Sequence, residues 1–132
     1  MLQGKVILVA DDDEAMSEIY AERVEAEGAI VLKAIDGVDT IQKINEFHPH
    51  LVILDIMMPE MNGFEVLEKI KKDPVSRNIP VMILTALSDT KNRARGTELG
   101  AVEYIVKSEV MPIEVLRRIK DYVSIEPVSI GQ

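Results

Sequence analysis

Hydrophobic residues fall into two patterns along the chain: short unbroken runs, and longer segments in which they recur every three or four positions. The unbroken runs cover residues 6–10, 51–54, 81–84 and 104–106, and a fifth run at residues 30–34 is interrupted by Lys33. β-Branched residues recur in all five runs, and this length and composition favour strands over helices. Three of the runs are apolar on both faces, which is typical of parallel strands covered by helices on both sides.

The segments between the runs carry apolar residues at helical spacing. These residues are Met16, Ile19, Tyr20 and Val24, then Ile41 and Ile44, then Phe64, Leu67 and Ile70, and last Ile113, Leu116, Ile119 and Val123. Gly28 ends the first helix, Pro74 follows the third, and Pro112 suits the first turn of the last. Residues 89–99 are mostly polar and contain Gly96, so they predict a helix of low intrinsic stability.

The alternation of strands and helices with short connections predicts an α/β fold, a (βα)5 doubly wound parallel five-stranded sheet with right-handed crossovers. A flavodoxin-like strand order, 2-1-3-4-5, places the strands with Lys33 and Glu103 at the two edges. We expect residues 1–123 to form one domain. Residues 124–132 show no periodicity, and we expect a tail or the start of a linker there.

Composition narrows the classes of function. A chain of 132 residues fits one domain, and its net charge of −8 argues against binding nucleic acid or an anionic membrane surface. The absence of cysteine excludes disulfides, thiolate zinc sites and thiol nucleophiles. No apolar run is long enough to cross a bilayer, and residues 1–5 carry no signal-peptide pattern, so we expect a cytoplasmic protein.

Polar residues stand where the predicted strands end. They are Asp11 and Asp12 after the first strand, Asp55 after the third, Thr85 after the fourth and Lys107 after the fifth. All lie at the carboxyl edge of the sheet, where open α/β sheets bind ligands. Because the first and third strands flank the point where the strand order reverses, the three aspartates are expected to converge in one crevice.

Converging carboxylates repel one another, at a cost of about 4 kcal/mol per pair at about 4 Å and an effective dielectric constant near 20. A hard divalent cation relieves this repulsion, and Mg²⁺ prefers a few carboxylates together with water and a phosphate oxygen. Lys107 adds a fixed positive charge, and Thr85 adds a hydroxyl donor. A carboxylate nucleophile, Mg²⁺, an ammonium group and a hydroxyl are the groups that phosphoryl transfer needs.

Each of these residues alone has an ordinary structural explanation. An aspartate after a strand often caps the next helix, which is our interpretation of Asp13. A threonine at a strand end is usually just hydrogen-bonded, and a lysine there is usually solvated. Only the joint placement of all five residues indicates a site. His48 and His50 lie before the third strand, at the opposite edge of the sheet, and are interpreted as surface loop residues.

Longer segments around these residues carry a family resemblance. They are Ile7-Leu8-Val9-Ala10-Asp11-Asp12-Asp13, Ala34-Ile35-Asp36-Gly37, Pro49, residues 51–63 from Leu51 to Gly63, residues 79–86 from Ile79 to Ala86, and Gly100-Ala101 followed by Tyr104-Ile105-Val106-Lys107. Together they resemble the receiver domains of two-component response regulators over residues 4–123. The resemblance implies a phosphoryl-accepting receiver in a phosphorelay, which switches a protein-binding surface and is not a turnover enzyme.

The resemblance also implies a role for each site residue. Asp55 is similar to the phosphoacceptor of the family. Asp12 corresponds to the direct carboxylate ligand of Mg²⁺, Asp11 to a ligand acting mostly through water, and the backbone carbonyl of Met57 to a further ligand. Asp55 itself completes this metal site.

Thr85 and Lys107 correspond to the residues that contact the phosphoryl oxygens. Tyr104 corresponds to an aromatic switch that turns inward when Thr85 moves toward the phosphoryl group. The alternative is that Tyr104 is an edge-strand tyrosine packed on its neighbour.

The implied phosphodonor is a histidine kinase or a histidine phosphotransfer protein, and the downstream protein is not identified by the sequence.

Three departures from the family pattern matter. Ser108 stands where a proline with a cis peptide is common, so the Lys107–Ser108 peptide is either strained or trans. Met57 and Leu87 are apolar where the family tunes loss of the phosphoryl group, which predicts a long-lived aspartyl phosphate. Val102-Glu103 replaces a common acidic pair, so we expect a monomer or a weak phosphorylation-dependent dimer.

Three alternatives belong to other classes of function. An aspartate-nucleophile phosphohydrolase usually carries an Asp-x-Asp pair after the first strand, whereas Ile56 and Met57 follow Asp55 here. A receiver that binds its partner without phosphorylation would not need the complete acidic set. A flavodoxin would have a phosphate-binding loop after the first strand instead of acids.

Overall fold

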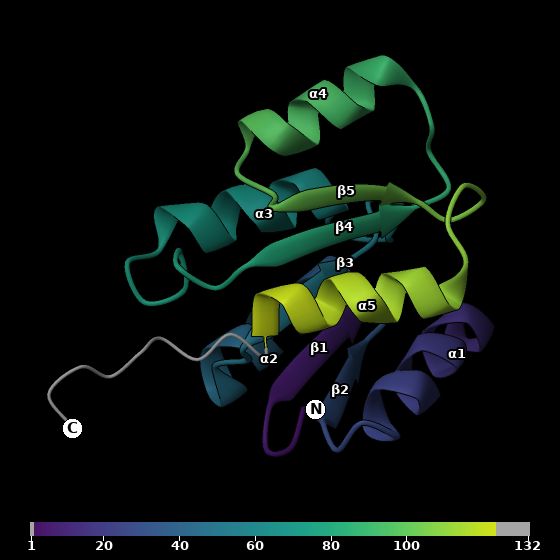
Figure 1. The fold of residues 1–132 in the computed structure, drawn as a ribbon. Coiled ribbons are helices and arrows are strands. Elements are labelled where there is room, and N and C mark those ends of the chain that lie inside the picture. Colours follow the sequence, from purple (N-terminus) through teal and green to yellow (C-terminus); the bar gives the residue numbers. More distant parts are fainter. Residues whose placement is uncertain (1, 124–132) are drawn as a thin grey trace, which may run out of the picture.

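The computed structural model describes residues 2–123, which form five strands and five helices in alternation (Figure 1). The strands are β1 (Val6–Ala10), β2 (Ile30–Ala34), β3 (Leu51–Leu54), β4 (Val81–Thr85) and β5 (Glu103–Val106). The helices are α1 (Glu14–Glu25), α2 (Gly37–Phe47), α3 (Gly63–Lys72), α4 (Thr90–Glu98) and α5 (Pro112–Val123). The alternation predicted from the hydrophobic pattern is therefore confirmed.

The five strands lie in one parallel sheet in the order β2-β1-β3-β4-β5. This confirms the flavodoxin-like order, with the strands that carry Lys33 and Glu103 at the two edges. α1 and α5 cover one face of the sheet, and α2, α3 and α4 cover the other (Figure 1). The sheet is thus buried on both sides, as expected for parallel strands.

β1 shows why the strands have unbroken apolar sequences. Ile7 and Val9 are buried in the core that includes α1 and α5, whereas Leu8 and Ala10 are buried in the core that includes α2 and α3. Burying one large aliphatic side chain stabilises the fold by about 1.5–3 kcal/mol, so both faces of the strand hold it between the two layers. In the three central strands, β1, β3 and β4, polar residues are therefore confined to the strand ends.

Polar side chains fix where most helices begin. The N-cap residues Asp13, Asp36, Asn62 and Asp89 each accept a hydrogen bond from the backbone N–H three residues later. Such a cap stabilises a helix by about 1 kcal/mol. The interpretation of Asp13 as a cap is confirmed, with Asp13 Oδ1 3.1 Å from the Met16 nitrogen. Asn62 and Glu65 form a reciprocal capping box at the start of α3.

A few boundaries differ from the sequence-based expectation. β4 includes Thr85 and β5 begins at Glu103, so both strands are one residue longer than their apolar runs. α4 has Gly96 as its only buried residue, in line with its predicted low stability. The predicted tail at residues 124–132 lies outside the described residues. Within residues 2–123, no helix has the length and apolar character needed to cross a membrane.

Candidate functional site

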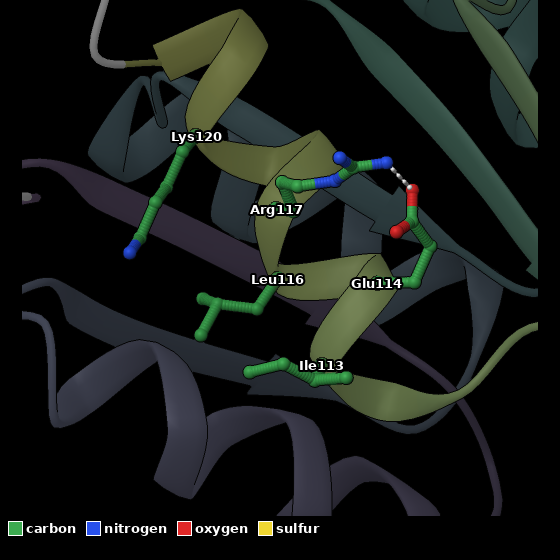
Figure 2. Close-up of a pocket in the computed structure, with 5 residues that line it drawn as sticks. All are labelled: Ile113, Glu114, Leu116, Arg117 and Lys120. Atoms are coloured by element: carbon green, nitrogen blue, oxygen red, sulfur yellow. Dashed lines mark hydrogen bonds and ion pairs between the residues drawn. The ribbon is translucent and has the colours of Figure 1, made fainter.

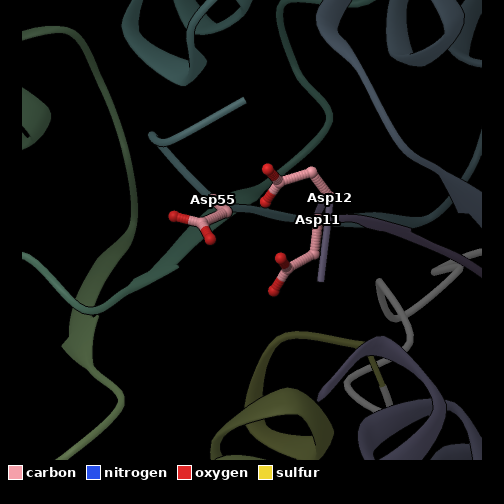
Figure 3. A group of neighbouring side chains, drawn as sticks. All are labelled: Asp11, Asp12 and Asp55. Carbon is pink, nitrogen blue, oxygen red and sulfur yellow. The ribbon is translucent and has the colours of Figure 1, made fainter. Parts of the chain in front are cut away.

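Three aspartates meet at the carboxyl edge of the sheet. Asp11 and Asp12 follow β1 and Asp55 follows β3, and these two strands are adjacent and in register. Each carboxylate offers an oxygen that lies within 4.8 Å of those of the other two (Figure 3). Asp11 and Asp55 are buried, and Asp12 is exposed to solvent. The sheet topology thus brings together the residues that the sequence placed at two separate strand ends.

Lys107 closes the buried side of this cluster. Its Nζ donates to Asp11 Oδ2 at 2.7 Å and to Asp55 Oδ2 at 3.2 Å. The backbone N–H of Lys107 donates to the carbonyl of Thr85 at 2.8 Å, which carries the β5 pairing one residue beyond the strand. One ammonium group against three carboxylates leaves the cluster with excess negative charge.

The pKa values reflect that imbalance. Burial raises the pKa of the Asp11 carboxyl, and the charge of Asp55 adds to this effect, although the Lys107 ammonium and the Asp13 N–H oppose it. Burial alone would lower the pKa of Lys107, but its hydrogen bond to Asp11 and the two carboxylate charges raise it overall. Lys107 is therefore charged at neutral pH, whereas burial makes ionisation of Asp11 less favourable than in water.

The donor set fits a hard divalent cation. All three side chains offer carboxylate oxygens, which are the ligands that such ions prefer, and the exposed Asp12 leaves a side of the cluster open to a partly hydrated ion. A divalent charge would also offset the negative charge that Lys107 leaves over. Asp11, Asp12 and Asp55 are the residues that would hold it.

The loop after β3 shapes the other side of Asp55. The Met57 N–H donates to Asp55 Oδ1 at 3.2 Å, and Met57 is 53% exposed. The Gly63 N–H donates to the Ile56 carbonyl at 2.9 Å, which folds the loop back on itself. A Cβ atom at Gly63 would lie 2.4 Å from the Asp55 carbonyl oxygen, so only glycine permits this approach.

Thr85 and Tyr104 are linked through the loop after β4. Thr85 is fully buried, and its Oγ1 accepts a hydrogen bond from the Leu87 N–H at 3.4 Å. The Tyr104 hydroxyl donates to the Leu87 carbonyl at 2.9 Å. Both candidate switch residues therefore contact the same residue, and the hydrogen bond of the Thr85 hydroxyl is made with this loop rather than with the acidic cluster.

Three positions that depart from the family pattern have defined surroundings in the structure. Within residues 2–123 there is no cis peptide, so the Lys107–Ser108 peptide is trans. Leu87 is partly buried and packs against the core, and its backbone contacts Thr85 and Tyr104. Glu103 is engaged within the chain, through an ion pair with Arg118 at 3.1 Å and a hydrogen bond from the Tyr122 hydroxyl.

Other polar or hollow features lie away from the acidic cluster. His48 is the exposed left-handed C-cap of α2, and His50 Nδ1 accepts from the Val6 N–H at 2.9 Å, so both are surface loop residues as expected. A hollow of about 320 Å³ lies on α5 and is lined by Ile113, Glu114, Leu116, Arg117 and Lys120 (Figure 2). Within that hollow Glu114 is paired with Arg117 at 2.7 Å, and it offers no metal-ligating cluster.

Comparison with known proteins agrees with this geometry. Residues 7–120 match the family model of the response regulator receiver domain. The chain belongs to the response regulator receiver family. This receiver is 44% identical over 101 residues to a transcriptional regulatory protein CpxR homolog of Haemophilus influenzae, covering 76% of the chain and 43% of that protein. It is 39% identical over 119 residues to a probable transcriptional regulator ycf27 of Porphyridium aerugineum, covering 90% of the chain and 48% of that protein.

The receiver thus spans about half the length of these curated relatives. Among solved structures, it resembles a CheY-like response regulator receiver domain protein of Methanospirillum hungatei, with a TM-score of 0.83, 31% identity, and 91% and 94% of the two chains covered. It also resembles the Mn²⁺-bound form of response regulator Rcp1, with a TM-score of 0.79, 26% identity, and 97% and 99% covered. The receiver of a two-component system inferred from the sequence is confirmed.

From the sequence we predicted the three aspartates, Thr85, Lys107 and Tyr104 as site residues, but not the neighbours that contact Asp55 and Tyr104 from other elements. Gly63 was noted only as part of a motif, and its close contact with the Asp55 backbone has no signal in the hydrophobic pattern. Arg93 and Glu109 form an ion pair at 2.6 Å beside Tyr104 and were not singled out at all. Such contacts join loops and helices that are distant in the chain, so spacing does not reveal them.

Proposed function

We propose that this receiver accepts a phosphoryl group on Asp55 from a phosphohistidine of a histidine kinase or a histidine phosphotransfer protein. The observation that carries the proposal is the surroundings of the Asp55 carboxylate. It lies within 4.8 Å of two further carboxylates and accepts hydrogen bonds from the Lys107 ammonium and the Met57 N–H. This combination of a nucleophile, a metal-binding acid pair and a fixed cation suits phosphoryl transfer.

In the proposed step, an Asp55 oxygen attacks the phosphorus atom of the donor. The bond between phosphorus and the donor nitrogen breaks, and its electron pair stays on the imidazole. Lys107 stabilises the charge on the phosphoryl oxygens and keeps the product carboxyl phosphate paired, and Thr85 offers its hydroxyl to another phosphoryl oxygen. This is one transfer onto the protein itself, which distinguishes the receiver from a turnover enzyme.

The metal in this proposal is Mg²⁺, which Asp11, Asp12, Asp55 and the Met57 carbonyl would hold. The ion supplies charge neutralisation of the phosphoryl oxygens when it is bound. The preference of Mg²⁺ for few carboxylates and several waters supports this choice. The Mn²⁺-bound form of the similar protein Rcp1 supports a divalent cation in general.

The proposed output is a change of the surface around α4, β5 and α5. Thr85 and Tyr104 form the switch, since both contact Leu87 at the start of the loop that leads into α4. A phosphoryl group that draws the Thr85 hydroxyl toward Asp55 would compete with its present contact. We place the receiver at residues 1–123 of a cytoplasmic signalling protein that binds a downstream protein and not nucleic acid through this domain.

The test is labelling by a small phosphodonor. Acetyl phosphate with Mg²⁺ should add one phosphoryl group to the wild-type protein, as measured by intact-protein mass spectrometry, and Asp55→Asn should add none. Glu14→Gln, a change to an exposed acid close by in the sequence, serves as the matched control and should be labelled normally. Labelling of Asp55→Asn at the wild-type rate would overturn the assignment of the phosphoacceptor.

A second expected result concerns the difference in stability between the metal-free and the Mg²⁺-bound protein. Mg²⁺ at about one hundred times its dissociation constant should stabilise the wild-type fold by about 2.7 kcal/mol, measured as a rise in unfolding temperature. Asp12→Asn should lose most of this rise, because it removes a ligand carboxylate from the cluster. Glu14→Gln should keep it. An equal rise in both variants would place the ion elsewhere.

A third expected result concerns the lifetime of the aspartyl phosphate. Met57→Asn should shorten the half-life of the aspartyl phosphate roughly tenfold, because a carboxamide can orient an attacking water and a thioether cannot. Release of inorganic phosphate after removal of the donor measures this rate. The matched control is Val75→Asn, which exchanges another exposed apolar residue far along the chain and should leave the half-life unchanged. Equally fast release from the wild type would contradict the predicted long lifetime.

A further inference from the structure

α4 buries little of its surface, and Arg93 links the helix to β5 and to the loop after β5. Arg93 Nη2 is 2.6 Å from Glu109 Oε1, which lies in the loop between β5 and α5. The same guanidinium lies 5.6 Å from the centre of the Tyr104 ring. Its Nε donates to the Ser88 carbonyl at 3.5 Å. Gly96 is the only buried residue of α4. The contacts of Arg93 with Glu109 and Tyr104 therefore add to that of Arg95, which lies 4.6 Å from the centre of the Phe64 ring, in fixing the helix.

The Tyr104 ring is enclosed by the same group of contacts. At its tip, the hydroxyl donates to the Leu87 carbonyl. Along its edge it lies against Gly96, where an added Cβ would be 2.9 Å from Tyr104 Cδ2. Over the ring lies Arg93, which is tied to Glu109. Asp89, the acid at the start of α4, is hydrogen-bonded to Asn92. The acid paired with Arg93 is Glu109.

We propose that Arg93 and Glu109 form a clasp that holds Tyr104 on the Leu87 carbonyl in the unphosphorylated protein, and that both are positioning residues of the switch. The proposal rests on the proposed function, in which Tyr104 is the switch residue. Glu109 follows Lys107 by two positions. The clasp therefore joins α4 to the loop that carries the site lysine, and it biases the ring toward its present position.

The clasp acts as a bias and not as a lock. Arg93 and Glu109 are partly exposed, with 38% and 51% of their side-chain surface accessible. An exposed ion pair shifts an equilibrium by up to about fivefold, and a cation–π contact at an exposed site shifts it by a similar factor. Shifts of this size suffice to change the populations of an element that has two positions of similar free energy.

The experiment observes Tyr104 in the full chain without donor or Mg²⁺. The protein is labelled with 3-fluorotyrosine, and the fluorine NMR signal of Tyr104 is assigned with Tyr104→Phe. Glu109→Gln should lower the ratio of Leu87-bound to displaced ring about two- to fivefold, and Arg93→Gln should lower it about tenfold. Arg93→Lys should lie between the wild type and Arg93→Gln, because lysine keeps the ion pair but loses the planar group over the ring.

The matched control is Arg117→Gln. It breaks an exposed ion pair on α5 of similar length, 2.7 Å to Glu114, that is not among the contacts of Tyr104 (Figure 2). Its Tyr104 signal should equal that of the wild type. As a second measurement, added salt should displace the ring in the wild type but not in Glu109→Gln, because salt screens only the pair that is still present.

Two outcomes would overturn the clasp: an unchanged Tyr104 signal in Glu109→Gln and Arg93→Gln, or an equal change in Arg117→Gln. The acetyl phosphate assay separates this failure from a failure of the proposed function. Normal labelling of Asp55 with an unmoved ring in the two variants refutes the clasp alone. If acetyl phosphate fails to label the wild-type protein but the Tyr104 ring is displaced in the two variants, phosphoryl acceptance is refuted and the clasp still stands as a structural feature of the protein.

Discussion

Gly63→Ala is expected to destabilise the protein by about 3 kcal/mol or more, which is at the upper end for adding one methyl group to a packed site. The added Cβ would lie 2.4 Å from the Asp55 carbonyl oxygen and 2.6 Å from Ile56 Cα. Both atoms belong to the backbone of the loop that follows β3, so no side-chain rotation relieves the contact. Either α3 moves outward or the loop that positions Asp55 shifts.

Chemical denaturation of the metal-free protein measures this change. The matched control is Glu14→Ala, which places alanine at the same position of another helix, directly after its N-cap, on an exposed site. That variant should stay within about 0.5 kcal/mol of the wild type. If Gly63→Ala were equally harmless, the close contact between α3 and the Asp55 backbone would not exist in solution. If the variant folds, its labelling by acetyl phosphate should also slow.

The sequence predicted the fold and the clustering of the aspartates for the same reason. In a sheet covered on both faces, the strands must be apolar, so the polar residues at their ends stand out and the strand order decides which of them meet. Asp11 and Asp55 lie more than forty residues apart, yet β1 and β3 are neighbours and bring their carboxylates together. The (βα)5 alternation was sufficient to predict that crevice.

The sequence did not predict the supports of the site, because these depend on contacts between loops. The Tyr104 hydroxyl binds a backbone carbonyl, that of Leu87, which any residue could supply. The ion pair of Arg93 and Glu109 joins two exposed residues whose spacing follows neither a helical nor a strand period. Gly63 matters because it has no Cβ atom, which leaves room for the Asp55 backbone. None of these features changes the periodicity or the composition from which the elements were predicted.

Lys107→Gln is expected to slow labelling by acetyl phosphate by a factor of about 10²–10³, the usual effect of removing one preorganised donor that stabilises charge in a transition state. The same change should destabilise the metal-free protein by about 3 kcal/mol at neutral pH, because it breaks a buried pair by removing one partner. Asp11 and Asp55 would remain, with only 5% and 6% of their side-chain surface exposed and no cation beside them.

The loss of stability should depend on pH in a definite direction. In the wild type the pKa of Lys107 is raised, so its contribution is fully present at neutral pH and is lost only when pH rises through that raised value. The pKa of Asp11 is raised by burial and by Asp55, and without Lys107 it should rise further. Protonation then relieves the variant as pH falls, so the difference from the wild type should be larger at about pH 8 than at about pH 5.

Two controls separate this electrostatic effect from a general loss of packing. Lys72→Gln removes a lysine that is 79% exposed and 3.7 Å from Glu68, and it should change stability by less than about 0.5 kcal/mol at either pH. Saturating Mg²⁺ should stabilise Lys107→Gln more than the wild type, since a divalent charge can replace the lost ammonium opposite Asp11 and Asp55. A deficit that is independent of both pH and Mg²⁺ would mean that Lys107 acts through its aliphatic chain, and its role as the fixed cation of the site would have to be abandoned.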